Sequence, residues 1–317
     1  MRNLMVLVGV SAMGLFAASG YCQTFPVKPV RIVTTDAGGS SDFFLRLMAQ
    51  DLTSALGQAV VIDNRPGSGV IPGEIVSKSA PDGYTLLFFT SNFWISPLLQ
   101  KTQYDPVRDF APISLATRAC SVLVVTPSLP AKSVKEVIAL ARSRPGELNY
   151  AHGSSGSASH LAGALFRAMT GVNMINIPYK GSAQALIDVM SGQTQLMFPN
   201  AAVVPGHIKS GKLRALAVTS AQPSVLFPRL PTVGESVPGF QSGTMNGLFA
   251  PARTPETIIR RLNQEVVRFV HLPETRERLH GAGTEPVGSS PQEFATVINT
   301  EMTMWSKVIK SAGIRAD

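Results

Sequence analysis

The stretch VRIVTTDAGGSSDFFLRLMAQDLTSALG, Val30 to Gly57, decides the fold because it joins a strand, a glycine turn and a helix in that order. Its first five residues are a short apolar run typical of a buried strand. After the turn, six apolar residues recur at helical spacing, namely Phe44, Leu45, Met48, Leu52, Ala55 and Leu56. Gly57 follows where a helix commonly ends on a left-handed glycine. The stretch therefore predicts one βα unit of an α/β sheet.

The rest of the chain continues this alternation of strands and helices. Further strands are predicted at Ala59–Asp63 and Tyr84–Thr90, with a short helix near Glu74–Ser79 between them. The segment LNYAHGSSGSASHLAGALFRAMTG, residues 148–171, repeats the plan of strand, Gly/Ser turn and helix. Later strands are predicted at 174–179, 213–219 and 246–250. The chain is predicted to be helical from Thr254 onward, with helices capped by Thr254 and Ser290, each followed by a proline. We expect two α/β lobes, each built on a mainly parallel sheet flanked by helices.

The first residues have the composition of an export signal. Arg2 precedes an apolar run from Leu4 to Ala18, and small residues follow it. That run is shorter than the roughly 20 residues that span a bilayer. We expect cleavage near residues 20–23, and both the exact site and a lipid on Cys22 stay open. Without Cys22 only Cys120 remains, so no internal disulfide can form.

The composition is that of a large globular protein, with 317 residues of which 44% are hydrophobic and 15% charged. The net charge of +8 suits a small acidic ligand or an anionic membrane surface, and it equally serves solubility. No nucleic-acid partner is expected.

Motifs for chemistry are weak. Residues 206–213 (GHIKSGKL) nearly match a phosphate loop, but Leu213 stands where a Ser or Thr is required and a strand follows instead of a helix. No Gly-x-Ser-x-Gly elbow surrounds Ser154 and Ser155. The five histidines form no i, i+4 pair for zinc, and for His152 and His160 a structural role is favoured over catalysis. We expect no enzyme, no metal and no cofactor.

The two Gly/Ser turns predict a binding site for an anion. A helix N-terminus carries unpaired N–H groups and a partial positive charge, so it can hold a carboxylate without a basic side chain. Ser40, Ser41 and Asp42 can alternatively serve only as a helix cap. Two such turns at the carboxyl ends of strands in two lobes favour a ligand between them. Asp42 is expected to cap the helix or brace the loop, and the direction of Asp36 is left open.

The order of motifs resembles the Bug family of periplasmic solute receptors, the TctC-like component of tripartite tricarboxylate transporters. The matching segments are KPVRIV, AGGSSD, VVIDNRPGSG, APDGYTLLF, YDPVRDFAPIS, VVTPSLPAKSVKEVIALAR, LNYAHGSSGSASHLAGALF, IPYKGSAQALIDVMSGQTQLMF, GKLRALAVTS, LPTVGESVPGF and LFAPARTP. The resemblance implies a Venus-flytrap fold that captures a small organic carboxylate and delivers it to membrane permease subunits. It also implies a periplasmic location.

The resemblance also supplies residues for the site. Ala37, Gly38, Gly39 and Asp42 match the first carboxylate loop, Ser157 matches a Ser/Thr position of the second loop, and Asn200 matches the asparagine after the QLMF strand. The full candidate set adds Asp36, Ser40, Phe93, Trp94, His152, Ser154 and Ser155. Family members usually carry an aromatic residue and a proline where this chain has Thr35 and Asp36. Pro199 stands where Asp is frequent, and His152 where a small residue is usual.

Phe93 and Trp94, in the predicted loop Ser91–Trp94, are the aromatic candidates. Core packing is the alternative for both. If they line the cleft, they favour an aromatic carboxylate.

The expected domains are a signal peptide at 1–22, a first lobe at 23–125 plus 246–317, and a second lobe at 126–245. The expected function is capture of a di- or tricarboxylate, an acidic amino acid or an aromatic acid by a monomer. The alternatives are a ligand sensor for a signalling partner and, as a weaker one, an exported hydrolase using Ser154 or Ser155.

Overall fold

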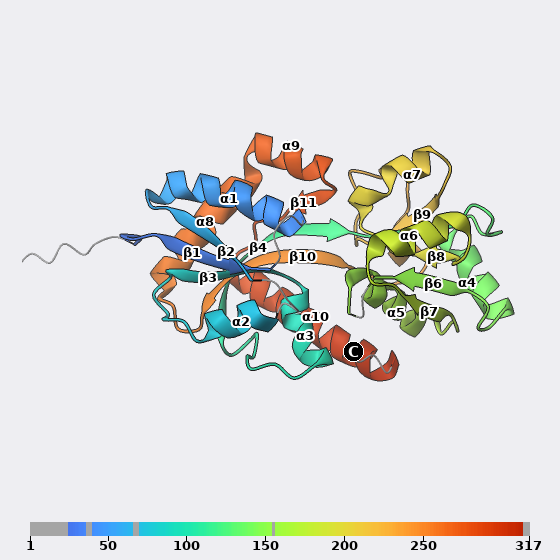
Figure 1. Ribbon diagram of the computed structural model, residues 1–317, viewed down its shortest axis with the longest axis horizontal. Helices are drawn as coiled ribbons and strands as arrows, with labels where there is room; N and C mark the ends of the chain where they lie inside the picture. The colour runs from blue at the N-terminus through green and yellow to red at the C-terminus, as the bar shows by residue number, and fades with distance from the viewer. Residues whose placement is uncertain (1–24, 36–39, 66–69, 154–155, 313–317) are drawn as a thin grey trace, which may run out of the picture.

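The computed structural model describes residues 25–35, 40–65, 70–153 and 156–312, so the predicted signal peptide lies outside it. The described chain forms two lobes side by side, each with a sheet covered by helices (Figure 1). The two-lobed α/β fold predicted from the sequence is confirmed.

The first lobe is built on a six-stranded sheet with the order β11-β4-β10-β3-β1-β2. Its strands are β1 (Val30–Thr34), β2 (Val60–Asn64), β3 (Thr85–Thr90), β4 (Phe110–Cys120), β10 (Gly243–Pro251) and β11 (Thr284–Pro286). β1 pairs in parallel with β2 and β3, whereas β10 and β11 run antiparallel to their neighbours.

The second lobe is built on a five-stranded sheet with the order β7-β6-β8-β5-β9. Its strands are β5 (Val122–Val125), β6 (Asn149–His152), β7 (Ile175–Pro178), β8 (Leu196–Met197) and β9 (Arg214–Val218). β6 pairs in parallel with β7 and β8, while β5 is antiparallel to β8 and β9. Both sheets are therefore mixed rather than mainly parallel. β10 and β5 enter from the other lobe and run antiparallel to their neighbours, and β11 adds a further antiparallel strand to the first sheet.

Helices cover both faces of the first sheet. They are α1 (Ser40–Leu56), α2 (Val70–Ser77), α3 (Asn92–Leu99), α8 (Glu256–His271), α9 (Pro273–Gly281) and α10 (Pro291–Ala312). One core cluster joins α1 and α8 to the sheet, and a second cluster joins α3 and α10 to the opposite face. Gly247 on β10 lets the ring of Phe294 on α10 lie against the strand, because a Cβ there would be 2.1 Å from the ring.

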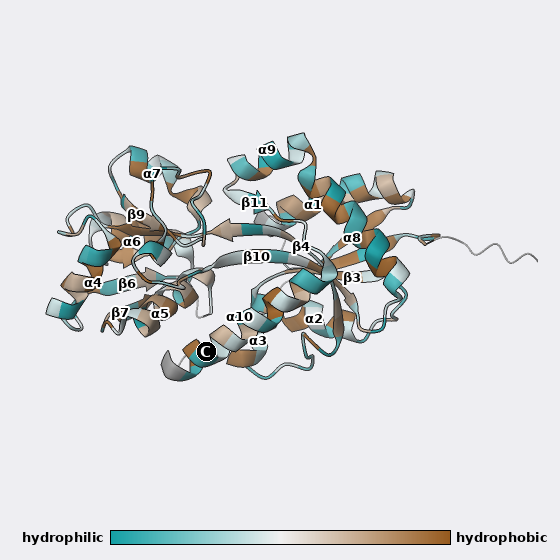
Figure 2. Cartoon of the chain, turned by 180° about the vertical axis from the view of Figure 1, so that it is seen from behind, coloured by the Kyte–Doolittle hydropathy of each residue, from teal (hydrophilic) through white to brown (hydrophobic). Residues whose placement is uncertain are grey.

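The second lobe carries shorter helices around its own core. They are α4 (Val134–Ser143), α5 (Ala158–Thr170), α6 (Ser182–Ser191), α7 (Pro205–Lys209) and the 3-10 turns η1 (Ala201–Val203) and η2 (Val233–Glu235). In Figure 2 the helices of both lobes alternate between hydrophobic and hydrophilic residues along their length, as expected for helices with one buried face. α10 also packs against α5, so the core continues from one lobe to the other.

Two features were not predicted from the sequence. The first is β4, the long strand that leads toward the second lobe. Its sequence does not show the pattern of a strand because it contains Pro112, Ser114, Thr117 and Arg118. The segment after β3 is helix α3 instead of a loop. The sheets divide the chain at Ser121 and Gly243, a few residues before the predicted boundaries at 125/126 and 245/246, because β5 belongs to the second sheet.

Candidate functional site

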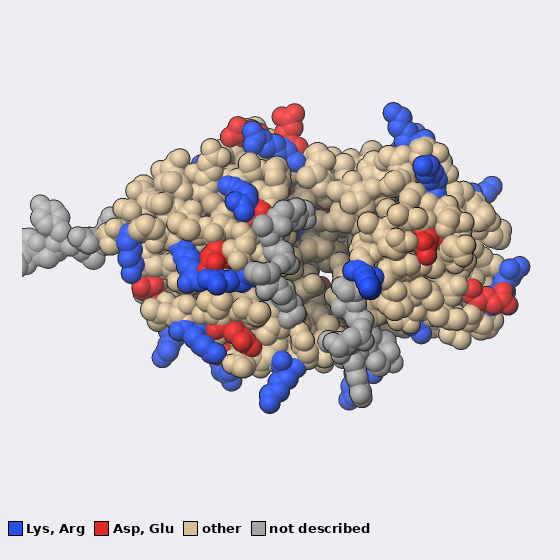
Figure 3. Space-filling view, in the orientation of Figure 1, with Lys and Arg blue, Asp and Glu red and all other residues tan. Residues whose placement is uncertain are grey.

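The candidate site is the hollow between the two lobes, which is visible in the space-filling view (Figure 3). Its floor is formed where the chain crosses between the sheets. Ser121 alone separates β4 from β5, and Gly243 at the start of β10 lies opposite Cys120. The Thr219 hydroxyl ties the crossings together: it accepts from Ser121 N at 2.8 Å and donates to the carbonyl of Ser242 at 2.7 Å. These bonds from one side chain to two backbone segments make the floor a defined hinge.

The first lobe contributes the start of α1, which follows β1 at the carboxyl end of the strand. The Asp42 carboxylate is almost fully buried there and accepts from Arg46 Nε at 2.9 Å and from Asn64 Nδ2 at 3.0 Å. Asn64 also donates to the carbonyl of Thr35 at 2.8 Å. The expectation that Asp42 caps or braces is confirmed, since it joins α1, β2 and the end of β1 and its charge faces Arg46.

A polar chain of three side chains lies behind Asp42 on the same lobe. The Ser41 hydroxyl donates to Asn246 Oδ1 at 2.6 Å, and Asn246 Nδ2 donates to Thr117 Oγ1 at 3.0 Å. Asn246 and Thr117 are buried, on β10 and β4 respectively. Neither residue was predicted to belong to the site. A signal existed, because Asn246 interrupts an otherwise apolar strand, TMNGLFAP, where a buried amide needs partners.

The second lobe contributes the turn between β6 and α5. Ser157 caps α5 by accepting from His160 N at 3.3 Å, and Gly153 N donates to Ser159 Oγ at 3.2 Å. Ser157 is therefore placed at the helix start, as expected.

Two histidines fix the shape of this turn. His152 and His160 stack with ring centroids 4.2 Å apart. His152 Nδ1 donates to the carbonyl of Gly153 at 2.6 Å, and His160 Nδ1 accepts from Gly156 N at 3.0 Å. Both rings bond to the backbone of the turn, which is the structural role that the sequence favoured. His152 exposes none of its surface, so it supports the wall of the site from behind.

The start of α6 lies beside the same turn and was not predicted as part of the site. A Cβ on Gly153 would be 3.4 Å from the backbone N of Ser182, the first residue of α6. The N-cap of α6 is Gly181, and no side chain caps this helix. Its first N–H groups therefore face the turn region with the partial positive charge of a helix N-terminus.

Asn200 lies next to the hinge, in a bridge with Ser121. Its Oδ1 accepts from Ala202 N at 2.9 Å and caps η1. Within the described chain its Nδ2 makes no hydrogen bond of its own, and the residue is only partly buried. Asn200 thus presents a neutral donor beside the floor of the site.

Phe93 and Trp94 do not line the site, which corrects one prediction. Both side chains are 0% exposed, in the first turn of α3. Phe93 stacks on Tyr104 and Trp94 lies edge-on to Phe294, so both belong to the core behind α10. The alternative of core packing is what the structure shows, because the segment is a helix that turns these rings toward the sheet.

The remaining predicted residues belong to the two Gly/Ser turns. Asp36, Ala37, Gly38, Gly39, Ser154 and Ser155 lie outside the described residues. Ser40 is the first residue of α1. In the ranges that the structure describes, no group of three His, Cys, Asp or Glu side chains could hold a metal ion.

A small cavity behind the hinge contains the other notable charges. It is lined by Arg118, Cys120, Glu285 and Glu301, among others. Burial raises the pKa of Glu301, while Trp305 Nε1, which donates to it at 3.0 Å, and Arg118 act in the opposite direction. Burial likewise raises the pKa of the Cys120 thiol. These groups sit under α10 and form part of the support of the hinge.

The fold and the site define a class of protein: a two-lobed receptor with helix starts and neutral donors around an interlobe hollow. The chain matches the model of the tripartite tricarboxylate transporter family receptor over residues 44–314. It is 34% identical to protein BugT of Bordetella pertussis, with 99% of each sequence covered. The chain belongs to this family of periplasmic solute-binding receptors.

Solved structures agree with this assignment. The R. palustris protein Rpa4515 with adipate is 37% identical, with a TM-score of 0.76 over 92% of this chain and 100% of its own. A TctC solute-binding protein from Polaromonas with no ligand is 27% identical, with a TM-score of 0.83 over 91% of this chain and 100% of its own. In the described part of the chain no helix is long and apolar enough to cross a membrane.

Proposed function

We propose that this protein captures a small dicarboxylate between its lobes in the periplasm and delivers it to the membrane subunits of a tripartite transporter. The observation that carries the proposal is the nature of the groups around the hollow. They are helix starts, serine hydroxyls and the Asn200 amide, and the described carboxylate among them, Asp42, is bound by Arg46 and Asn64. Such donors suit an anion.

The arrangement of the donors favours a ligand with an acid at each end. The start of α1 belongs to the first lobe, and the starts of α5 and α6 belong to the second. Two partial positive charges on opposite walls can each hold one carboxylate. Rpa4515, which is similar over 92% of this chain, was solved with adipate, a dicarboxylate. The core position of Phe93 and Trp94 removes the reason for an aromatic acid.

Closure of the lobes is the proposed mechanism. The chain is more similar in shape to the Polaromonas receptor without ligand than to Rpa4515 with adipate, although its sequence identity to the latter is higher. A difference in the angle between lobes lowers a whole-chain similarity without changing either lobe. This pattern fits an open arrangement that closes by rotation at the hinge when the ligand binds.

A thermal-shift screen tests the proposal. The chain from Gln23 onward is refolded from denaturant to remove bound ligand and mixed with a panel of dicarboxylates, tricarboxylates, amino acids and aromatic acids at about 1 mM. A ligand present at about 1,000 times its Kd adds about 4 kcal/mol, which shifts the midpoint by several degrees. We expect the shift from dicarboxylates, with sugars as the control.

The same samples separate a receptor from an enzyme. One-dimensional NMR after prolonged incubation should return the bound acid unchanged. A folded protein that responds to no carboxylate, or one that consumes it, contradicts the proposal.

A further inference from the structure

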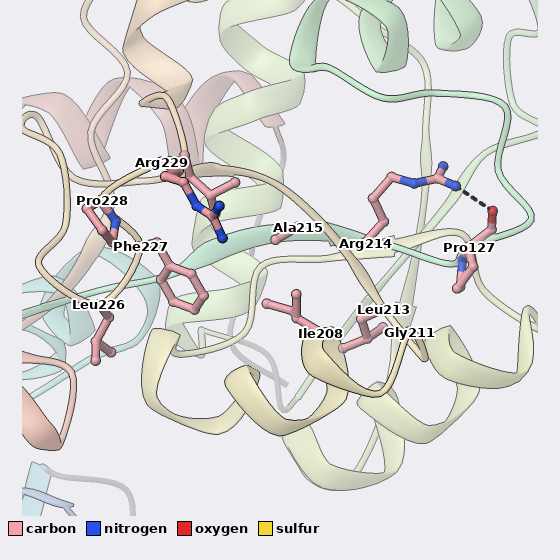
Figure 4. A pocket seen from close by; sticks show the side chains of 11 residues that line it. Pro127, Ile208, Gly211, Leu213, Arg214, Ala215, Leu226, Phe227, Pro228 and Arg229 are labelled. Atoms are coloured by element: carbon pink, nitrogen blue, oxygen red, sulfur yellow. Dashed lines mark hydrogen bonds between the residues drawn. The ribbon is translucent and has the colours of Figure 1, made fainter.

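A second concave surface lies on the second lobe, outside the candidate site. It is a pocket of about 500 Å³ against β9, the edge strand of the sheet. Its apolar lining includes Ile208, Leu213, Ala215, Leu226, Phe227 and Leu230 (Figure 4). Most of these side chains pack on the outside of the lobe's core cluster, so the surface of the pocket is held in place by the core. None of its lining residues belongs to the site between the lobes.

The chain segment that lines most of this pocket carries charges of one sign. Residues 189–234 contain no Asp or Glu, and their four Lys and Arg residues are Lys209, Lys212, Arg214 and Arg229. In Figure 3 the basic side chains over the region of α7 have no acidic side chain among them on that face. The surface is thus complementary to an acidic partner.

The two arginines at the pocket have different roles. Arg214 donates to the backbone carbonyls of Pro127, Leu129 and Ala131, and so holds the β5–α4 segment. Arg229 is exposed and makes no salt bridge within the described chain. Its guanidinium reaches over the pocket near Phe227 (Figure 4). An apolar pocket with an unpaired guanidinium at its mouth fits an apolar side chain that has a carboxylate next to it.

We propose that this pocket docks a protein segment that presents a large apolar side chain beside a carboxylate, on the membrane subunits that receive the ligand. The identity of the partner rests on the proposed function. A second copy of the chain does not fit, because a two-fold dimer would place the basic surface on itself. A lipid surface offers negative charge, but it presents no single apolar group that would fill a pocket of this volume.

Two substitutions test the docking surface. Arg229→Glu reverses the exposed charge, and Ala215→Phe fills the pocket from β9. Arg253→Glu is the control, because Arg253 is an exposed arginine on the first lobe. Binding to the transporter's membrane subunits in lipid nanodiscs is measured by biolayer interferometry, and binding of adipate is measured by calorimetry. Circular dichroism establishes whether each variant is folded. If Ala215→Phe does not fold, the result for Arg229→Glu alone decides the test.

We expect Arg229→Glu and Ala215→Phe to weaken binding to the membrane subunits at least tenfold, with the affinity for adipate within twofold of wild type. The control should change neither. Unchanged binding by Arg229→Glu overturns the proposal, and so does equal binding to empty anionic nanodiscs, which would indicate a lipid surface. If wild type binds the subunits through Arg229 but binds no carboxylate, the docking surface stands and the proposed function fails.

Discussion

The two polar atoms of the Asn200 side chain have different roles, one in the fold and one at the site. Its oxygen caps η1, and its nitrogen is left as a donor next to the hinge. Aspartate is an equally good N-cap, so the oxygen can be kept while the donor is replaced by negative charge. Because the two roles can be separated, a substitution at Asn200 tests the sign of the charge on the ligand.

We expect Asn200→Asp to lower the affinity for a dicarboxylate more than tenfold, because a donor is lost and a like charge is added. The thermal midpoint without ligand should stay within about 2 °C, since the cap is retained. Calorimetry and thermal unfolding measure the two effects. Asn176→Asp, at an exposed position of β7, serves as the matched control. Equal affinities in wild type and Asn200→Asp would remove Asn200 from the site.

Single residues were the hardest level to predict from the sequence. The bracing role of Asp42 was expected, and its bond to Arg46 is local, since the two residues are one helical turn apart. The contact between Ser41 and Asn246 joins positions 205 residues apart, and the local sequence around either residue does not predict this partner. Phe93 and Trp94 were misplaced because their direction depends on α3 being a helix, which Pro97 within the segment hides.

Helix α10 is the element that joins the two lobes on the side away from α1. It packs on β4, α3 and α5, and its Glu301 lies partly buried near Arg118 and Glu285. The raised pKa of Glu301 means that ionisation is disfavoured in the folded state. Between the usual pKa of glutamate and the raised one, the folded state holds a proton that the unfolded state has released, so stability falls as pH rises across that interval.

Glu301→Gln should remove this dependence. An uncharged amide needs no ionisation, and its oxygen can still accept from Trp305 Nε1. We expect the variant to be more stable than wild type at pH 7 and to lose that advantage below the usual pKa of glutamate, where Glu301 is protonated in the folded and the unfolded state. Urea unfolding across this pH range measures it. A constant difference between the two proteins at every pH would show that ionisation of Glu301 is not the cause.

Elements were predicted where their signals are local. The helix start at Ser290 was recognised, and Ser290 and Glu293 form the expected reciprocal cap, with Glu293 N donating to Ser290 Oγ at 3.2 Å and Ser290 N donating to Glu293 Oε2 at 2.8 Å. Thr254 was expected to cap α8, but its hydroxyl donates to the carbonyl of Pro251 instead. β4 was missed because its strand conformation depends on pairing with β10 on one side and β11 on the other, and not on a local sequence pattern.

The whole molecule depends on few connections at the hinge. The Thr219 hydroxyl bonds to both crossing segments. It is fully buried, so water cannot replace it. The contact holds the two crossing segments of the chain together.

Thr219→Val keeps the shape of the side chain and removes the hydroxyl. We expect the free energy of unfolding to fall by about 2 kcal/mol, because Ser121 N and the carbonyl of Ser242 lose a buried partner. Small-angle scattering should show a broader distribution of interlobe distances. Thr296→Val removes an exposed hydroxyl of α10 and should change neither quantity. A Thr219→Val protein with wild-type scattering would mean that the hydroxyl does not constrain the lobes.

The positions of the two tryptophans have a spectroscopic consequence. Trp94 is 0% exposed and Trp305 3% exposed, and both lie in the core of the first lobe. Neither can be quenched by direct contact with a bound acid, so titrations followed by intrinsic emission can stay silent while the ligand binds. A change in emission would instead come from Trp305, on the helix that touches α5, and would report movement of the lobes.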